Sequence, residues 1–384
     1  MPPSLSDFPG SPAARILGQL SSGLDPRSWR ASNPTEALAR GFQSLRSGLF
    51  MAESLPVFWI QRPRGSAQQP PPPEAIEATL TRLRELFDRD AEQIGEGLVP
   101  LSVLAPRDPI GHGARLLRIL ADGVTLSARR RQRRAKEFSP RAKRWLDDLP
   151  NYYKQNFHYQ TDGYLSERSA DLYEHQVELL FRGGGDAMRR LLLRPLKKAL
   201  GYTNGRGMRF LEIGSGTGIT TRFVAMAFPD AKITALDLSY PYMKHAQKQL
   251  CDFDRLDFVQ GDAAALEFQD GVFDAIYSSF LFHELPLPVR EAVLEESMRV
   301  LRPGGFFGFV DSLQNGDDDQ LDWALDLFPR QFHEPYYAQY AANPMEDFLR
   351  MAGFEAIESD TGYLSKVVSA RAPANKRDSE DTSH

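Results

Sequence analysis

The stretch FLEIGSGTGITTRFV, residues 210–224, decides the fold. An apolar run ends at Ile213, glycines follow at positions 214, 216 and 218, and an apolar segment with helical spacing begins. Glycine permits a sharp turn and lets the backbone approach a ligand closely. The stretch predicts a strand, a ligand-binding turn and a helix. A tight turn without a ligand and an NAD site have similar spacing, so both stay open at this point.

Short apolar runs alternate with helical segments from residue 202 on. The predicted strands are 208–213, 232–238, 256–260, 273–279, 306–312, 354–360 and 362–370. This alternation predicts an α/β fold with a parallel sheet covered by helices on both faces. The last two strands are too close together for a crossover helix, so the last strand is expected to be antiparallel near one edge.

The chain upstream has a different character, and we divide the sequence into four parts. Residues 1–74 are expected to be an extension that ends in a proline-rich linker. Residues 75–200 are expected to form a helical cap, because Ile76, Leu80, Leu83, Leu86 and Phe87 have helical spacing. Residues 201–370 form the ligand-binding domain, and residues 371–384 are expected to be a disordered tail.

Composition limits the location and the partners of the protein. The net charge of −5 argues against nucleic acid as a partner. Cys251 is the single cysteine, so no internal disulfide can form. The sequence contains no apolar run of about 18 residues and no pattern of a secretory signal, so a cytoplasmic location is expected.

A second acidic position supports nucleoside binding. Asp237 ends the next predicted strand, about twenty residues beyond the glycines, where a carboxylate accepts both hydroxyls of a ribose. Asp237 could instead cap the following helix, although Ser239 could also fill that role.

Three further blocks follow in order: Gly-Asp-Ala at 261–263, FDAIYSSFLFHEL at 273–285 and RVLRPGGFF at 299–307. Together with the glycine turn and Asp237, they resemble class I S-adenosylmethionine (SAM)-dependent methyltransferases over residues 200–370. The resemblance implies a Rossmann-like seven-stranded sheet, SAM as the cofactor and methyl transfer as the activity. It also leaves open a SAM-using enzyme that does not donate a methyl group, and a SAM-binding scaffold without turnover.

The resemblance also implies roles for single residues. Those expected to bind SAM are Glu212 with Gly214, Gly216 and Gly218 (methionine part), Asp237 (ribose), Asp262 with Ala263 (adenine), and Ser278 (beside the methyl group). No metal is expected. The enzyme mainly has to align the acceptor with the methyl group and exclude water. His283 is expected either to take a proton from the acceptor or only to pack.

Two aromatic segments, 156–174 and 331–344, flank the predicted SAM domain and are expected to border one acceptor pocket. The candidate substrate-binding residues are His158, Tyr159, Tyr164, Tyr336 and Tyr337. Mixed aromatic and polar residues suit a small, lipophilic organic acceptor. Between 129 and 144 the chain has nine Lys or Arg, which form either a solvated helix face or a contact with anionic lipid headgroups. The oligomeric state and the atom that is methylated are not predicted.

Overall fold

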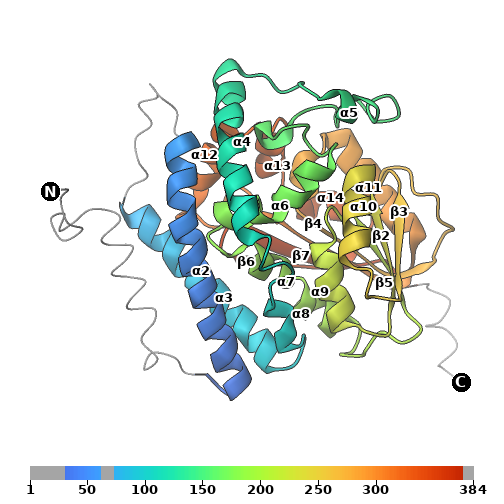
Figure 1. Ribbon diagram of the computed structural model, residues 1–384. Coiled ribbons are helices and arrows are strands. Elements are labelled where there is room, and N and C mark those ends of the chain that lie inside the picture. Colours follow the sequence, from blue (N-terminus) through green and yellow to red (C-terminus); the bar gives the residue numbers. More distant parts are fainter. Residues whose placement is uncertain (1–30, 62–72, 375–384) are drawn as a thin grey trace, which may run out of the picture.

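The computed structural model describes residues 31–61 and 73–374 of the chain. Residues 1–30, most of the predicted proline-rich linker and the predicted tail from residue 375 lie outside these ranges. Figure 1 shows a central sheet flanked by helices, with the long helices α2 and α3 crossing on one side of it. Within the described ranges, none of the helices is long and apolar enough to cross a membrane.

The sheet has seven strands in the order β3-β2-β1-β4-β5-β7-β6. The strands are β1 Arg209–Ile213, β2 Lys232–Asp237, β3 Leu256–Gln260, β4 Phe273–Ser279, β5 Leu301–Ser312, β6 Glu355–Gly362 and β7 Ser365–Arg371. Strands β1 to β5 pair in parallel, whereas β7 runs antiparallel to both β5 and β6. The seven-stranded sheet and its antiparallel last strand are therefore confirmed. Strand β5 starts earlier than predicted, because Leu301 pairs with Phe273 before a shift of register.

Helices cover both faces of the sheet. Those of the C-terminal half are α9 Ile219–Ala227, α10 Tyr240–Gln249, α11 Leu287–Val300, α12 Asp322–Gln331, α13 Tyr337–Ala342 and α14 Met345–Met351, with a short 3-10 turn η5 at Phe282–Glu284. Helix α9 packs on one face around Phe223, and α11 and α14 pack on the other around Val293 and Phe348. Because apolar residues alternate along the strands, each face has its own core.

The described N-terminal half is helical, and we call it the cap, which here includes α2 from the segment expected to be an extension as well as residues 75–200. Its elements are α2 Pro34–Gln61, α3 Pro73–Gly95, η3 Leu101–Leu104, α4 His112–Gln132, α5 Pro140–Lys143, η4 Phe157–Tyr159, α6 Glu167–Leu180, α7 Gly185–Arg190 and α8 Leu193–Ala199. Helix α2, which lies in the segment expected to be an extension, packs against α3, α4 and α6. Helix α4 ends at Gln132, and the next residue, Arg133, has a left-handed backbone. The basic run 129–144 is therefore not one continuous helix.

Candidate active site

A central cavity lies at the carboxyl ends of β1, β2 and β4, beneath the cap. We call it the central cavity and define it by its lining: Tyr152, Tyr153, Phe157, Tyr164, Tyr173, Glu174, Arg189, Gly214, Ser215, Gly216, Thr217, Ile219, Leu236, Asp237, Leu238, Tyr242, Gly261, Asp262, Ala263, Ser279, Phe280, Leu281, Glu284, Leu285 and Val293. The carboxyl edge of a parallel sheet is where ligands bind in folds of this kind. The structure thus brings the glycine turn, Asp237, Asp262 and Ala263 to one cavity, as the sequence analysis expected.

The glycine turn forms one wall of the central cavity. Gly214, Gly216 and Gly218 all have positive φ angles, of 66°, 54° and 79°. A side chain at Gly216 would meet no atom within 4 Å, whereas one at Gly218 would lie 2.8 Å from Leu250 Cδ1. Gly216 and Gly218 therefore have different roles. Gly216 leaves the backbone bare toward the cavity, and Gly218 allows α9 to pack closely on α10.

Glu212 supports the turn from below rather than lining the cavity. Its side chain is fully buried, and its carboxyl accepts a hydrogen bond from the hydroxyl of Thr221. Burial raises the pKa of Glu212 to about 8. Burial thus favours the neutral carboxyl, and Glu212 is not among the lining residues of the cavity.

Asp237 is one of the acidic residues that line the central cavity. Its Oδ2 accepts a hydrogen bond from Gly216 N and its Oδ1 accepts one from Ser239 N, both at 2.7 Å. Burial raises the pKa of Asp237 to about 6, although these two donors favour the ionised form. The helix-cap role falls to Ser239, whose hydroxyl accepts a hydrogen bond from Tyr242 N. Asp237 is thus left to face the cavity.

At the end of β4, the serine that lines the cavity is Ser279 and not the expected Ser278. Ser278 is fully buried and is not part of the cavity lining, whereas Ser279 is. Side chains alternate between the two faces of a strand, so neighbouring serines point in opposite directions. Ser279 Oγ lies 2.8 Å from Thr220 Oγ1 on α9, and this contact connects β4 to the glycine turn.

His283 does not reach the cavity lining either. Its Nδ1 lies 2.6 Å from Asp311 Oδ1, and both side chains are buried. Burial opposes the charged ring, yet the Asp311 carboxylate raises the pKa of His283 to about 9. The contact with Asp311 thus favours the charged ring and fixes its orientation behind the cavity lining.

A different histidine lies between two carboxyl groups. His158 Nε2 is 2.6 Å from Glu334 Oε1 and 3.6 Å from Glu284 Oε1. Burial opposes the charged ring, but the two carboxylates raise the pKa of His158 to about 10. Tyr164 donates its hydroxyl hydrogen to Glu284, which lines the cavity. The backbone of His158 has a φ of 56°, and His158 N donates a hydrogen bond to His333 O. The segments 156–174 and 331–344 therefore contact each other here, although His158, His333 and Glu334 are not among the lining residues of the central cavity.

The other predicted acceptor residues take supporting positions. The ring of Tyr159 packs against His333, with 5.5 Å between ring centroids. The Tyr336 hydroxyl accepts a hydrogen bond from Gln155, and Tyr337 is buried with its hydroxyl 2.6 Å from Ser312 Oγ. Of the five predicted acceptor residues, only Tyr164 lines the cavity.

Several residues that line the central cavity were not predicted from the sequence. Five aromatic side chains from the cap and α10 line the cavity beside Tyr164: Tyr152, Tyr153, Phe157, Tyr173 and Tyr242. Arg189, on α7, is the one cation among the described lining residues, and its side chain is 3% exposed. Its Nη1 lies 3.5 Å from Glu174 Oε2, and Glu174 also accepts a hydrogen bond from Thr217 of the glycine turn. The abundance of tyrosine between 152 and 173 was the only sequence signal for this wall.

Comparisons with known proteins agree with this geometry. A protein-family model described as a methyltransferase domain matches residues 210–305. A fatty-acid O-methyltransferase of Mycolicibacterium smegmatis is 31% identical over 196 residues, which is 50% of this chain and 65% of that protein. A probable phthiotriol/phenolphthiotriol dimycocerosates methyltransferase of Mycobacterium ulcerans is 42% identical over 106 residues, 27% of this chain and 40% of that protein. The chain thus spans less than two thirds of either relative.

Solved structures with similarity to this chain include a SAM-dependent methyltransferase from Aquifex aeolicus, with 20% identity and a TM-score of 0.37, covering 48% of this chain and 92% of that one. Another is phosphoethanolamine N-methyltransferase 2 from Haemonchus contortus in complex with SAM. It has 16% identity and a TM-score of 0.38, and the match covers 49% of this chain and 57% of that one.

Proposed function

We propose that this chain, which carries a class I SAM-dependent methyltransferase domain, transfers the methyl group of SAM to a small lipophilic acceptor. One observation carries the proposal: a single cavity is bounded on one side by the glycine turn with Asp237 and on the other by aromatic side chains of the cap. A nucleoside cofactor and an apolar acceptor would face each other across such a cavity.

The charges on the cavity wall suit SAM. Each Asp237 oxygen holds one backbone donor and has lone pairs left for a ribose hydroxyl. Asp262 and Ala263, which line the cavity, would contact the adenine. Arg189 is the buried cation that would pair with the methionine carboxylate, close to the glycine turn. When bound, SAM supplies an electrophilic methyl group.

The polar cluster at the acceptor end suggests which acceptor fits. His158 lies between the carboxyl groups of Glu334 and Glu284, which favour its charged ring. We propose that Glu284 accepts a hydrogen bond from an acceptor hydroxyl and takes its proton as the methyl group is transferred. His158 and Tyr164 would hold Glu284 in place. The names of the relatives, which include fatty-acid and dimycocerosate methyltransferases, support a lipophilic acceptor.

The experiment is to incubate the full chain with methyl-labelled SAM and a lipid extract, and to identify labelled products by mass spectrometry. We expect a labelled small molecule and an equal amount of S-adenosylhomocysteine. Methylthioadenosine without a methylated product would instead indicate a SAM-using enzyme of another class. Label in protein or RNA would contradict the acceptor class.

Glu284→Gln tests the acceptor end on its own. The variant should lower kcat by about 10²–10⁴-fold, because the acceptor proton loses its base, and should leave the Kd for S-adenosylhomocysteine within about twofold. His245→Gln, which changes a residue outside the central cavity, serves as the matched control. An unchanged kcat in Glu284→Gln would show that alignment alone accounts for the rate.

The cellular setting is also a proposal. We propose a cytoplasmic protein that contacts anionic lipid through the basic run, where Arg131, Arg133, Arg134, Lys136 and Lys143 are exposed. Co-sedimentation with phosphatidylserine vesicles tests this contact, and charge reversal at Arg131 and Arg133 should abolish it. Equal sedimentation with neutral phosphatidylcholine vesicles would argue against it.

A further inference from the structure

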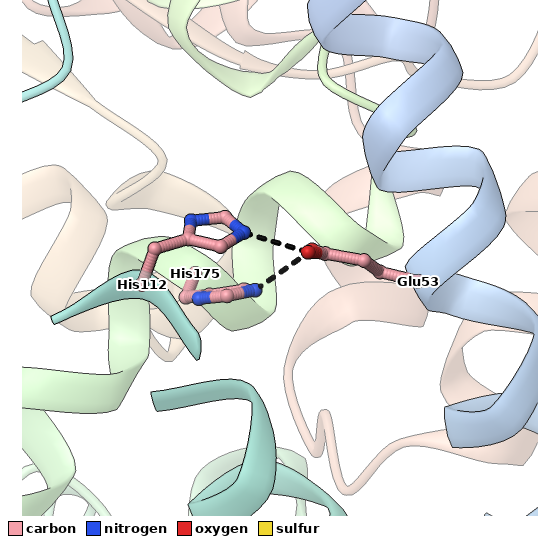
Figure 2. A group of neighbouring side chains, drawn as sticks. All are labelled: Glu53, His112 and His175. Carbon is pink, nitrogen blue, oxygen red and sulfur yellow. Dashed lines mark hydrogen bonds and ion pairs between the residues drawn. The ribbon is translucent and has the colours of Figure 1, made fainter. Parts of the chain in front are cut away.

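A second group of ionisable side chains lies outside the central cavity. Figure 2 shows Glu53 on α2 facing two stacked histidines, His112 at the start of α4 and His175 on α6. His112 Nε2 is 2.7 Å from Glu53 Oε1, and His175 Nε2 is 3.2 Å from Glu53 Oε2. Three helices that are distant in sequence therefore direct their donor atoms at one point.

We infer that Glu53, His112 and His175 bind a divalent transition metal ion, with Zn²⁺ as the best match. Two imidazole nitrogens and one carboxylate are a common zinc ligand set that leaves the fourth position open. The three ligand atoms lie within 4.8 Å of one another. Bonds of ~2.0–2.1 Å in a tetrahedral site place ligand atoms roughly 3.3 Å apart. The His175 contact already has this spacing, and the His112 contact has to widen by about half an ångström.

Packing restricts the movement of the two rings. Their centroids are 4.4 Å apart and the ring planes differ by 29°. Phe50, one turn before Glu53 on α2, packs edge-on against both rings, at 5.8 Å from His112 and 5.6 Å from His175. Metal sites gain affinity when the ligand rotamers are already set by their neighbours.

The fourth position can be reached from outside. His112 and His175 line a second cavity of about 430 Å³, bounded by α2, α4, α6 and the start of α9. The side chain of His112 is 28% exposed, whereas that of His175 is 3% exposed. Asp108 and Arg115, which line the same cavity, pair with each other. An ion can therefore enter from solvent and keep a water molecule as its fourth ligand.

The site would act on the cap, and through it on the glycine turn. Glu174, the residue before His175 on α6, accepts a hydrogen bond from Thr217 of the glycine turn. An ion that joins α2, α4 and α6 would restrict the movement of α6 and of this contact. The role we infer is structural, and it does not depend on methyl transfer.

The test uses the full chain without an affinity tag, treated with a chelator and then titrated with Co²⁺, whose visible absorption reports tetrahedral nitrogen and oxygen ligands. We expect saturation at about one equivalent, displacement of Co²⁺ by Zn²⁺, and a melting temperature raised by roughly 5 °C in the presence of Zn²⁺. No saturable absorption in the unmodified protein would overturn the inference.

Variants then locate the ion. Glu53→Gln keeps the shape and one acceptor oxygen but removes the charge, and His112→Gln removes the more exposed ligand. Each should weaken Co²⁺ binding by at least about tenfold. His245→Gln is the matched control, because His245 lines the same cavity but is not part of the cluster. Unchanged Co²⁺ affinity in both cluster variants would show that Glu53 only accepts hydrogen bonds from the two rings.

Discussion

His283 and Asp311 form a buried pair behind the central cavity, with 2.6 Å between Nδ1 and Oδ1. Asp311 Oδ2 also accepts a hydrogen bond from Phe282 N, so the carboxylate connects β5 to the turn that follows β4. The same turn contains Glu284. The pair therefore fixes the turn that carries Glu284, a lining residue of the central cavity.

The first prediction concerns how this pair affects stability. The pKa of His283 is raised from an ordinary value of 6.5 to about 9, so its contribution is fully present below pH 6.5 and is lost as the pH rises through 9. The difference in unfolding free energy between the unmodified protein and His283→Gln should shrink by up to about 3 kcal/mol between pH 6 and roughly pH 9.5. Urea unfolding at several pH values measures it, and a difference that does not change with pH would contradict the pairing.

The second prediction concerns cofactor affinity and pH. Asp237 has a pKa of about 6, and ribose hydroxyls donate to its ionised form. Affinity for S-adenosylhomocysteine should therefore rise with pH through 6, and binding at pH 5 should be about tenfold weaker than at pH 7.5. Titration calorimetry of Asp237→Asn is the control, because this variant should bind weakly and almost independently of pH between these values. Full affinity of the unmodified protein at pH 5 would remove Asp237 from the ribose site.

The sheet could be predicted closely from the sequence. Strands β3 and β4 begin and end at the predicted residues, because short apolar runs between turn residues mark buried strands clearly. The turn at Gly214 to Gly218 was equally clear, since positive φ angles there require glycine. Local chemistry was sufficient for both features.

The rest of the site depends on tertiary contacts. Whether Ser278 or Ser279 faces the cavity depends on which face of β4 each side chain takes, and the sequence alone does not fix this, because a shift of one residue reverses the side-chain direction. Arg189 lies in a short helix with ordinary charge spacing, and only packing buries it against the cavity. The contact between His158 and Glu334 joins two distant segments, so no local pattern could have indicated it.

The third prediction concerns the different effects of substituting Gly216 and Gly218. Gly216→Ala puts a methyl group into open space at the cavity, so it should cost about 1–2 kcal/mol of stability from backbone strain and abolish measurable cofactor binding. Gly218→Ala carries the same strain and adds contacts at 2.8 Å with Leu250 and 3.0 Å with Ala246. It should cost roughly 1–3 kcal/mol more. Urea unfolding and calorimetry on both variants test whether Gly216 serves the cavity and Gly218 the helix packing. Equal loss of stability in the two variants would show that the glycines do not differ in this way.

The fourth prediction concerns how two helices of the cap, α3 and α7, are held together. Arg190 on α7 donates two hydrogen bonds to Asp90 on α3, from Nε to Oδ1 at 2.8 Å and from Nη2 to Oδ2 at 2.6 Å. Both side chains are buried, so Asp90→Ala leaves an uncompensated buried guanidinium and should lower the unfolding free energy by about 3–5 kcal/mol. Asp347→Ala breaks an exposed pair with Arg350 and should cost no more than about 1 kcal/mol.

The double variant with Asp90→Leu and Arg190→Met distinguishes charge pairing from packing. If the loss in Asp90→Ala comes from the unpaired charge, replacing both partners by apolar side chains should recover most of the stability, because no buried charge remains. Chemical unfolding of the three variants gives the comparison. A double variant no more stable than Asp90→Ala would mean that the geometry of this ion pair, rather than its charge balance, keeps α3 on α7.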